Sequence, residues 1–257
     1  TGEIRGIYLT ILNIAIATGP LLITVVGTHD QFRAFYIAAA VMLMPLIVLA
    51  YFFLWPKHKH ERYTAHSLPF SLWWRTASIR NVSLSRFVLE FFYTFMAVYT
   101  PIYLHTFVGF SWTEIGVIFT VMLLPFILFE WPAGELADRK FGEKEIMALG
   151  FIITALSLIF MPHLGKSLIG WAVILFCSRI GASFIEITGE SYFFKQVSAH
   201  DTGLISIFRL SRSVGLIIGA AVGALTITLF PYKYIFYVLA MACLFGWRIA
   251  RRLVDTK

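Results

Sequence analysis

Charged residues are scarce in this sequence of 257 residues, in which Lys, Arg, Asp and Glu together make up only 14%. Soluble domains carry about 25% charged residues, and the mean hydropathy of this chain is high at +0.79. Because 59% of the residues are hydrophobic, too little polar surface is left to face water on all sides, and a soluble globular domain is excluded. The composition therefore predicts an integral membrane protein.

Cysteine and clustered metal ligands are also nearly absent. The two cysteines, Cys177 and Cys243, both lie in apolar segments, where a thiol packs as a small hydrophobic group. His58, His60 and His66 lie close together without an acidic or cysteine partner, so we interpret them as solvated residues. The sequence therefore indicates no disulfide framework, no metal site, no catalytic residue and no cofactor.

The formal net charge of +7 does not require a nucleic-acid partner. The basic residues fall in short segments beside apolar runs, where membrane topology explains them. No cleavable signal peptide precedes the first apolar run, and the chain opens on Thr1 without an initiator methionine. We expect the sequence to begin part-way through a longer protein.

Long apolar runs dominate the chain. A hydrocarbon core of about 30 Å needs roughly 20 apolar residues per helix, and this measure predicts an all-α, polytopic membrane helix bundle. The expected spans are 6–27, 32–55, 81–108, 111–133, 144–164, 167–194, 202–230 and 232–250.

The basic residues predict the orientation of these spans. If the spans alternate, one side of the membrane receives Lys57, Lys59, Arg62, Arg75, Arg80, Arg139, Lys140, Lys144, Lys195, Arg248, Arg251 and Arg252, and the other receives only Arg33, Lys166 and Lys233. Since cytoplasmic loops are enriched in Lys and Arg, the start of the chain, the 134–144 segment and the C-terminus are expected in the cytoplasm. The cell membrane is the expected location.

A weak internal repeat predicts the domain organisation. FYIAAAVML at 35–43 resembles FYVLAMACL at 236–244, with an offset of 201 residues, a length that suits six membrane helices and a transporter built from two halves. We expect residues 1–55 to hold the last two helices of a first bundle. Residues 56–80 then form a basic, amphipathic cytoplasmic linker, and residues 81–257 a complete second bundle of six helices.

The segment from Gly134 to Lys144, GELADRKFGEK, joins two of the expected spans. Gly134 permits two helices to approach closely, and Gly142 permits the chain to reverse direction. The carboxylate of Asp138 is suited to accept hydrogen bonds from the N-terminus of a neighbouring helix. The segment therefore predicts a structured cytoplasmic turn.

This segment resembles the signature loop of the major facilitator superfamily, G-x-L-A-D-R-x-G-R-K. One extra residue separates Asp138 from Gly142, and Glu143 stands where the family usually has a base. The residues that match the motif are Gly134, Leu136, Ala137, Asp138, Arg139 and Gly142.

The resemblance implies a solute transporter of twelve helices, of which this chain holds the last eight, and in which two bundles rock to give alternating access. By the same resemblance, the Asp138 loop is a gate that docks on a helix of the other half, expected to be the 6–27 span. Glu130, at the cytoplasmic end of the 111–133 span, is expected to belong to the same gate network as Gly134, Asp138, Arg139 and Gly142.

The 167–194 span carries an unusual polar stripe. Arg179, Ser183, Glu186 and Glu190 are separated by four, three and four residues, so at about 100° per residue they share one helix face. Ionisable residues inside a membrane usually face a polar cavity or a partner. The stripe therefore predicts a water-accessible surface along this helix.

Two interpretations of the stripe remain open. Arg179 is a candidate for contact with an anionic substrate or for tuning a neighbouring carboxylate, and its segment R-I-G-A-S resembles the family's cavity motif R-x-x-Q-G, without the glutamine. Glu186 is a candidate proton carrier, because burial favours the neutral form of a carboxyl group. In the other interpretation these residues form ion pairs that fasten the bundle.

Two other spans also hold charges. In the 202–230 span, Arg212 is expected to pair with Glu186, or Arg209 with Glu190. In the 81–108 span, Arg86 and Glu90 lie four residues apart. Two interpretations remain open: Arg86 and Glu90 form an ion pair within the helix, or Glu90 lines the cavity.

Glycines Gly215, Gly219 and Gly223 recur every four residues in the 202–230 span. They predict a smooth ridge for close helix contact. Packing and sliding both remain open as its role.

These patterns favour a solute transporter, with a small-molecule solute, protons as a candidate coupling ion and the lipid bilayer as partners, and with no nucleic acid and no required oligomer. A membrane-embedded acyl or glycosyl transferase is disfavoured because the histidines lack a paired acid, so an enzyme is not expected. A non-transporting scaffold or receptor, or a relic fragment, remains a further alternative.

Overall fold

The computed structural model of the chain describes residues 13–14, 16, 32–54, 68–198 and 201–254. Within these ranges every regular element is helical, which confirms the predicted all-α class. The α-helices are α2 (Phe32–Leu54), α3 (Phe70–Arg75), α4 (Ala77–Thr94), α5 (Thr100–Tyr103), α6 (Trp112–Leu136), α7 (Glu143–Phe160), α8 (Leu168–Gln196), α9 (Thr202–Leu229) and α10 (Tyr234–Ala250). Three π-helical turns, η2 (Phe95–Tyr99), η3 (Leu104–Val108) and η4 (Ala137–Phe141), and the 3₁₀ turn η5 (Met161–His163) extend or connect them.

Five helical runs in the described part of the chain are long and apolar enough to cross a membrane. They are Ala77–Val108, Trp112–Phe141, Glu143–His163, Leu168–Gln196 and Thr202–Leu229. Two shorter apolar helices are Leu43–Phe52 and Tyr234–Ala250. The protein is an integral, multi-pass membrane protein.

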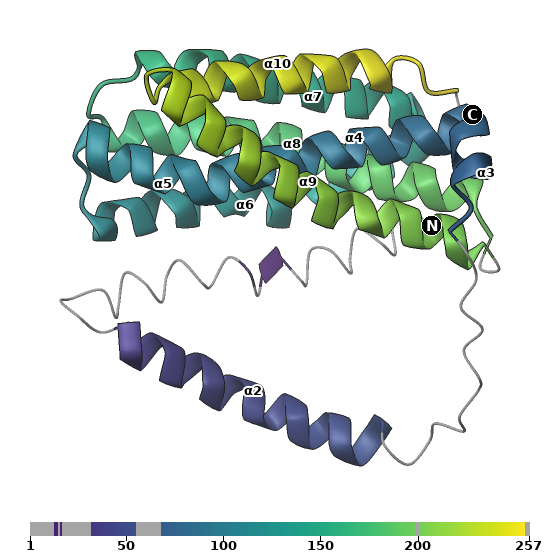
Figure 1. Cartoon of the computed structure of the whole chain (residues 1–257), viewed down its shortest axis with the longest axis horizontal. Coiled ribbons are helices and arrows are strands. Elements are labelled where there is room, and N and C mark those ends of the chain that lie inside the picture. Colours follow the sequence, from purple (N-terminus) through teal and green to yellow (C-terminus); the bar gives the residue numbers. More distant parts are fainter. Residues whose placement is uncertain (1–12, 15, 17–31, 55–67, 199–200, 255–257) are drawn as a thin grey trace.

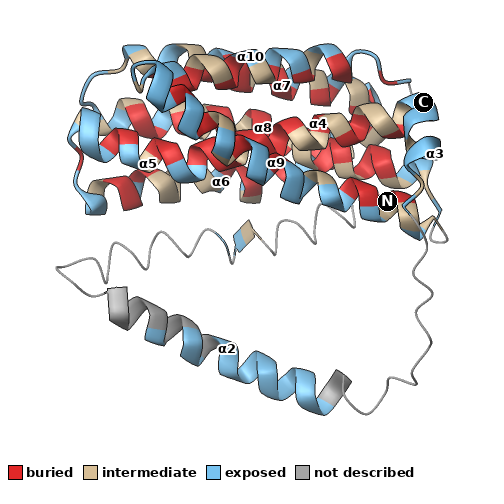
Figure 2. Cartoon of the chain, in the orientation of Figure 1, coloured by how far each residue is buried: buried red, intermediate tan, exposed pale blue. Residues whose placement is uncertain are grey.

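Helix α8 is the centre of the bundle and packs against α4, α6 and α7 (Figure 1). Helix α10 packs on α7 and α4, and α9 packs along α4. The described buried core runs from Ile79 to Leu253 and is densest along α8 and α4, as Figure 2 shows. Among its largest fully buried side chains are Trp171 and Tyr192, near the two ends of α8.

Helix α2 lies apart from this bundle (Figure 1), and its described side chains are exposed (Figure 2). Met44 and Phe52, for example, are 64% and 67% exposed. Apolar side chains of this kind are suited to lipid or to another helix. The bundle that begins at α4 therefore builds its described core without α2.

Local sequence explains how the membrane helices begin and bend. Helix α6 starts at a capping box, in which the Ser111 hydroxyl accepts from the Glu114 N–H and the Glu114 carboxylate accepts from the Ser111 N–H. The helical run 77–108 widens into η2 directly before Pro101, where the Thr100 N–H bonds to the Phe95 carbonyl. Pro101 has no N–H to donate to a helical hydrogen bond. The wider turn of η2 accommodates this loss, so the helical run continues from α4 into α5.

The glycine ridge of α9 packs on α4, as the spacing predicted. A Cβ atom on Gly219 would lie 3.0 Å from Cβ of Thr94, and one on Gly223 would lie 2.1 Å from the Tyr99 ring. The Tyr99 ring is fixed because its hydroxyl donates to the Ala220 carbonyl over 2.5 Å. The ridge therefore sets how closely α9 and α4 approach.

The structure changes several of the expected boundaries. Helix α4 begins at Ala77, so the last residues of the expected 56–80 linker belong to the first bundle helix. The 111–133 span continues helically through η4 to Phe141. Of the expected 6–27 span only Asn13, Ile14 and Ile16 are described, and they are helical, while residues 56–67 lie outside the described residues.

Candidate functional site

Arg86 is the centre of a charged cluster that joins α4 to α8. Its guanidinium Nη2 lies 2.7 Å from Oε1 of Glu90, one turn further along α4. Its Nη1 lies 3.4 Å from Oε1 of Glu186 and 3.6 Å from Oε1 of Glu190, both on α8. The Arg86 side chain is only 10% exposed, so one buried cation is shared by three carboxylates.

Tyr93 and Arg212 complete this cluster. The Tyr93 hydroxyl donates to Oε2 of Glu186 over 2.5 Å, and Nε of Arg212 on α9 lies 3.8 Å from Oε2 of Glu90. Residues 86, 90 and 93 are spaced by four and three, so α4 presents all three on one face.

These partners differ from the two pairings expected from the sequence. Arg212 pairs with Glu90 and not with Glu186, while Arg86 takes Glu186 and Glu190. Arg209 is exposed. The reason is geometric: the charged face of α8 meets α4, and spacing within one helix does not say which neighbour that face will meet.

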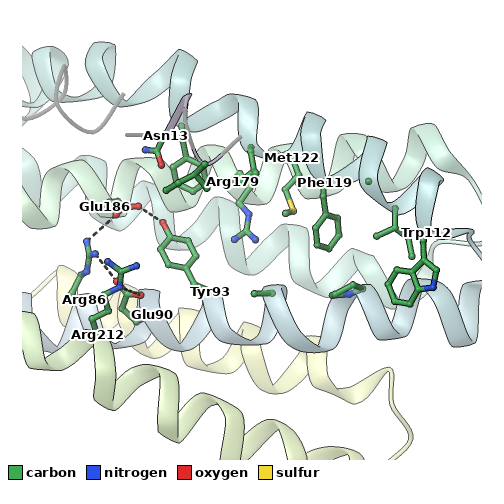
Figure 3. Close-up of a pocket in the computed structure, with 17 residues that line it drawn as sticks. Asn13, Arg86, Glu90, Tyr93, Trp112, Phe119, Met122, Arg179, Glu186 and Arg212 are labelled. Carbon is green, nitrogen blue, oxygen red and sulfur yellow. Dashed lines mark hydrogen bonds and ion pairs between the residues drawn. The ribbon is translucent and has the colours of Figure 1, made fainter. Parts of the chain in front are cut away.

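A cavity of about 650 Å³ opens beside this cluster. Its size falls in the range of about 300–1,000 Å³ that is usual for small-molecule sites. Its charged lining residues are Arg86, Glu90, Arg179, Glu186 and Arg212, and most of its apolar wall is formed by Trp112, Ile115, Phe119, Met122, Leu123 and Phe126. Figure 3 shows Arg86, Glu90, Glu186 and Arg212 at one end, Trp112 at the other, and Arg179 between them.

Arg179 differs from the other charged lining residues. It is 4% exposed, and its Nε and Nη1 have no hydrogen-bond acceptor among the residues that the structure describes. Its guanidinium carbon lies 4.7 Å from the ring centre of Phe92 and 5.5 Å from that of Tyr93. Cation–π contacts stabilise the charge in part, but they supply no oxygen acceptor.

The predicted cytoplasmic turn is largely helical. Gly134 is buried in α6, and Asp138 and Arg139 belong to the π turn η4, which closes with the Gly142 N–H bonded to the Ala137 carbonyl over 3.1 Å. Gly142 has φ 91° and ψ 156°, a conformation that only glycine adopts without strain. The reversal of the chain predicted at Gly142 is therefore confirmed.

Asp138 is paired within the same bundle. Its Oδ1 accepts from Nζ of Lys195 on α8 over 2.8 Å, and Lys195 also pairs with the buried Glu143. Arg139 forms an exposed pair with Glu135, at 3.0 Å. Lys195 on α8 therefore joins the carboxylates of Asp138 and Glu143 at this turn.

Glu130 lies apart from the ion pairs of Asp138. It is fully buried, and its Oε2 accepts from Nδ2 of Asn13 over 2.9 Å. Since Asn13 belongs to the expected 6–27 span, the described contact to that span is made by Glu130, whereas the partner described for Asp138 is Lys195. The sequence predicted one network for Glu130 and Asp138, whereas their described partners differ.

The comparison with protein families agrees with this geometry. The profile described as Major Facilitator Superfamily matches residues 82–256. The chain belongs to the major facilitator superfamily. The match begins inside α4 and runs past α10, so it covers every helix that carries the charged cluster. No curated protein matches the chain closely enough to count as a relative.

Family membership makes the chain a major-facilitator type transporter, with solute and lipid as its partners, and the superfamily consists of transporters, not enzymes. In the described ranges, no group of three or more His, Cys, Asp or Glu residues is arranged to hold a metal ion.

The sequence singled out several of the charged residues described above but did not predict the contacts of three residues. Arg86 was expected only as a partner of Glu90, and neither Tyr93 nor Asn13 was considered. The four-and-three spacing of residues 86, 90 and 93 could have placed Tyr93 on the charged face. Nothing in the spacing could have identified Asn13.

Proposed function

We propose that this chain is part of a secondary active transporter of the cell membrane that works by alternating access, with the Asp138 turn and the C-terminus in the cytoplasm. The observation that carries the proposal is the 650 Å³ cavity, in which charged side chains from α4, α8 and α9 meet an apolar wall. Ionisable groups that face a cavity inside a membrane protein usually mark a solute or ion pathway.

Proton coupling is the mechanism that the cluster supports best. Glu186 shares Arg86 with Glu90 and also accepts from Tyr93. A proton on Glu186 weakens its attraction for Arg86 and leaves that guanidinium to Glu90 and, more distantly, to Glu190. Protonation thereby shifts a contact between α8 and α4, which is what coupling a proton to a change of state requires.

Uptake by the complete gene product tests this function. The full protein in proteoliposomes should accumulate at least one solute from a chemically mixed panel, with saturable kinetics and with stimulation by an inward proton gradient. Glu186→Gln should abolish the stimulation, because a glutamine cannot carry the proton. Glu145→Gln, which changes an exposed carboxylate of α7, should transport as the unchanged protein does. Proton stimulation that persists in Glu186→Gln contradicts this role.

We also propose that the bundle from α4 to the end of the chain forms one half of the transporter and that residues 1–55 contribute helices to another, joined by the segment before α4. Two observations support this division. The described core lies between Ile79 and Leu253, and the described side chains of α2 are exposed.

A further inference from the structure

The cavity also indicates the class of solute, an inference that rests on the proposed transport function. We propose that Arg179 is the anion-recognition residue of this cavity and that the solute is an amphipathic organic anion. Its single carboxylate, sulfonate or similar group lies against the Arg179 guanidinium. Its apolar body lies along Phe119 toward Trp112.

The first support is the state of the guanidinium itself. Arg179 is 4% exposed, yet its Nε and Nη1 lack an acceptor among the described residues. Leaving buried N–H groups of a charged side chain unsatisfied is costly, and such groups in a native structure call for a partner. Arg179 lines the cavity, so an anion held there lies against the guanidinium, and a change of side-chain rotamer turns its unpaired N–H groups toward the anion.

The second support is that Glu186 is already engaged. Glu186 lies on the same helix as Arg179 and lines the same cavity. Its Oε1 pairs with Arg86 and its Oε2 accepts from Tyr93. Both carboxylate oxygens of Glu186 therefore have partners. The guanidinium of Arg179 remains available to bind an anion in the cavity.

The third support is the composition of the wall. Three arginines and two carboxylates line the cavity, so the lining favours an anion. Phe119, Met122 and Trp112 line the same cavity, and Figure 3 shows them on the side of Arg179 away from Arg86 and Glu90. An apolar wall with one available guanidinium fits a solute that has one charged end and one apolar end.

Equilibrium binding to the complete protein tests the inference without requiring transport. The protein is placed in nanodiscs of phosphatidylcholine at pH 7.4, and the probes are radiolabelled benzoate, 2-naphthoate, octanoate and 2-naphthalenesulfonate, each with its neutral amide. At least one anion should bind about tenfold or more tightly than its amide, because a charged hydrogen bond is lost in the amide. If every amide binds as well as its anion, the inference is overturned.

Substitution then assigns the preference to one side chain. Arg179→Gln should weaken binding of the preferred anion by about 10- to 100-fold and leave binding of its amide unchanged. Arg179→Lys, which keeps the charge, should recover part of the loss. The matched control is Arg209→Gln, because Arg209 is an exposed arginine outside the cavity, and this variant should bind the anion normally.

Unchanged anion binding in Arg179→Gln overturns the inference. If that variant does not fold, Arg179→Lys decides, and an anion affinity equal to that of the unchanged protein contradicts a role that depends on the guanidinium.

Two further arms separate the alternatives. If the anion preference disappears in nanodiscs that contain phosphatidylglycerol, the guanidinium binds an anionic lipid headgroup, and the assignment to a solute is overturned. Uptake of the same anion is measured in parallel. Binding that depends on Arg179 without uptake supports the anion site and contradicts the transport function, so the two failures are distinguishable.

Discussion

At the scale of single residues, Arg86 is the side chain on which the charged cluster depends. It is the described cation that reaches Glu90, Glu186 and Glu190 together, from a position only 10% exposed. A buried ion pair adds little net stability when both partners are present, because desolvation offsets the attraction. Removing one partner is different, since the remaining charge stays buried without compensation.

Arg86→Met should therefore lower the free energy of unfolding by about 3–5 kcal/mol, measured by denaturant titration of the protein in mixed micelles. Adding Glu186→Gln should recover part of the loss, because one uncompensated carboxylate is then removed. Arg209→Met, at an exposed arginine of α9, is the control and should change little. A single Arg86→Met variant as stable as this control would show that the cluster is not held by Arg86.

At the scale of helices, the glycine ridge of α9 fixes the contact with α4. A methyl group on Gly223 meets the Tyr99 ring at 2.1 Å, and that ring is held by its bond to the Ala220 carbonyl. Gly165, in the loop before α8, has no neighbouring heavy atom within 4 Å of the same methyl position. The two positions form a matched pair of Gly→Ala changes.

Gly223→Ala should destabilise the protein by about 1–3 kcal/mol through overpacking, whereas Gly165→Ala should leave the melting temperature unchanged. Thermal unfolding followed by tryptophan fluorescence measures both. Equal melting temperatures for the two variants would mean that α9 moves away from α4 without cost. That result would favour sliding over fixed packing.

The turn between α6 and α7 is the second element with a testable role. Asp138→Asn removes the charge that pairs with Lys195 over 2.8 Å. Both side chains are about a quarter to a third exposed, so the effect on stability should stay below about 1 kcal/mol. The proposed gating role predicts that transport falls as well, since the substitution would change the relative stability of the two transport states.

Uptake and membrane insertion are measured together for Asp138→Asn in the complete protein. Lys140→Gln, an exposed change in the same turn, is the control. Normal insertion with normal uptake would count against a gating role for Asp138.

The sequence predicted elements better than contacts. Hydropathy located the helices, and the four-three-four spacing of α8 identified Arg179 and Glu186, which both line the cavity. Partner choice could not be predicted, because Glu186 meets Arg86 only through the way α8 packs on α4. The turn at 134–144 was recognised from its residues, but the continuation of α6 through η4 depends on backbone hydrogen bonds that no side-chain pattern encodes.

At the scale of the whole molecule, the described core belongs to one bundle. Its buried members lie between Ile79 and Leu253, and the described apolar side chains of α2 are exposed. A bundle with its own core should survive when its connection to the rest of the chain is cut. Protease cleavage within the proposed linker tests this division. The proposed orientation predicts that the linker is accessible to protease from the cytoplasmic side.

A protease site inserted between Lys59 and His60 should be cut in inside-out vesicles but not in intact cells. After cutting, the fragment that contains α4 to α10 should keep its melting temperature, because the described core does not cross the linker. Cleavage in intact cells would reverse the orientation. Unfolding of the fragment after cleavage would contradict the division into halves.

The π turn η4 also explains how the 134–144 segment accommodates one residue more than the signature motif has between Asp138 and Gly142. A π turn closes between residues five apart, as Ala137 and Gly142 do here, and thus holds one residue more than an α-helical turn. The additional residue between Asp138 and Gly142 is absorbed in that wider ring. We expect a chain without this residue to close the same corner as an ordinary α-turn, so that the length of this corner can change by one residue without displacing α6 or α7.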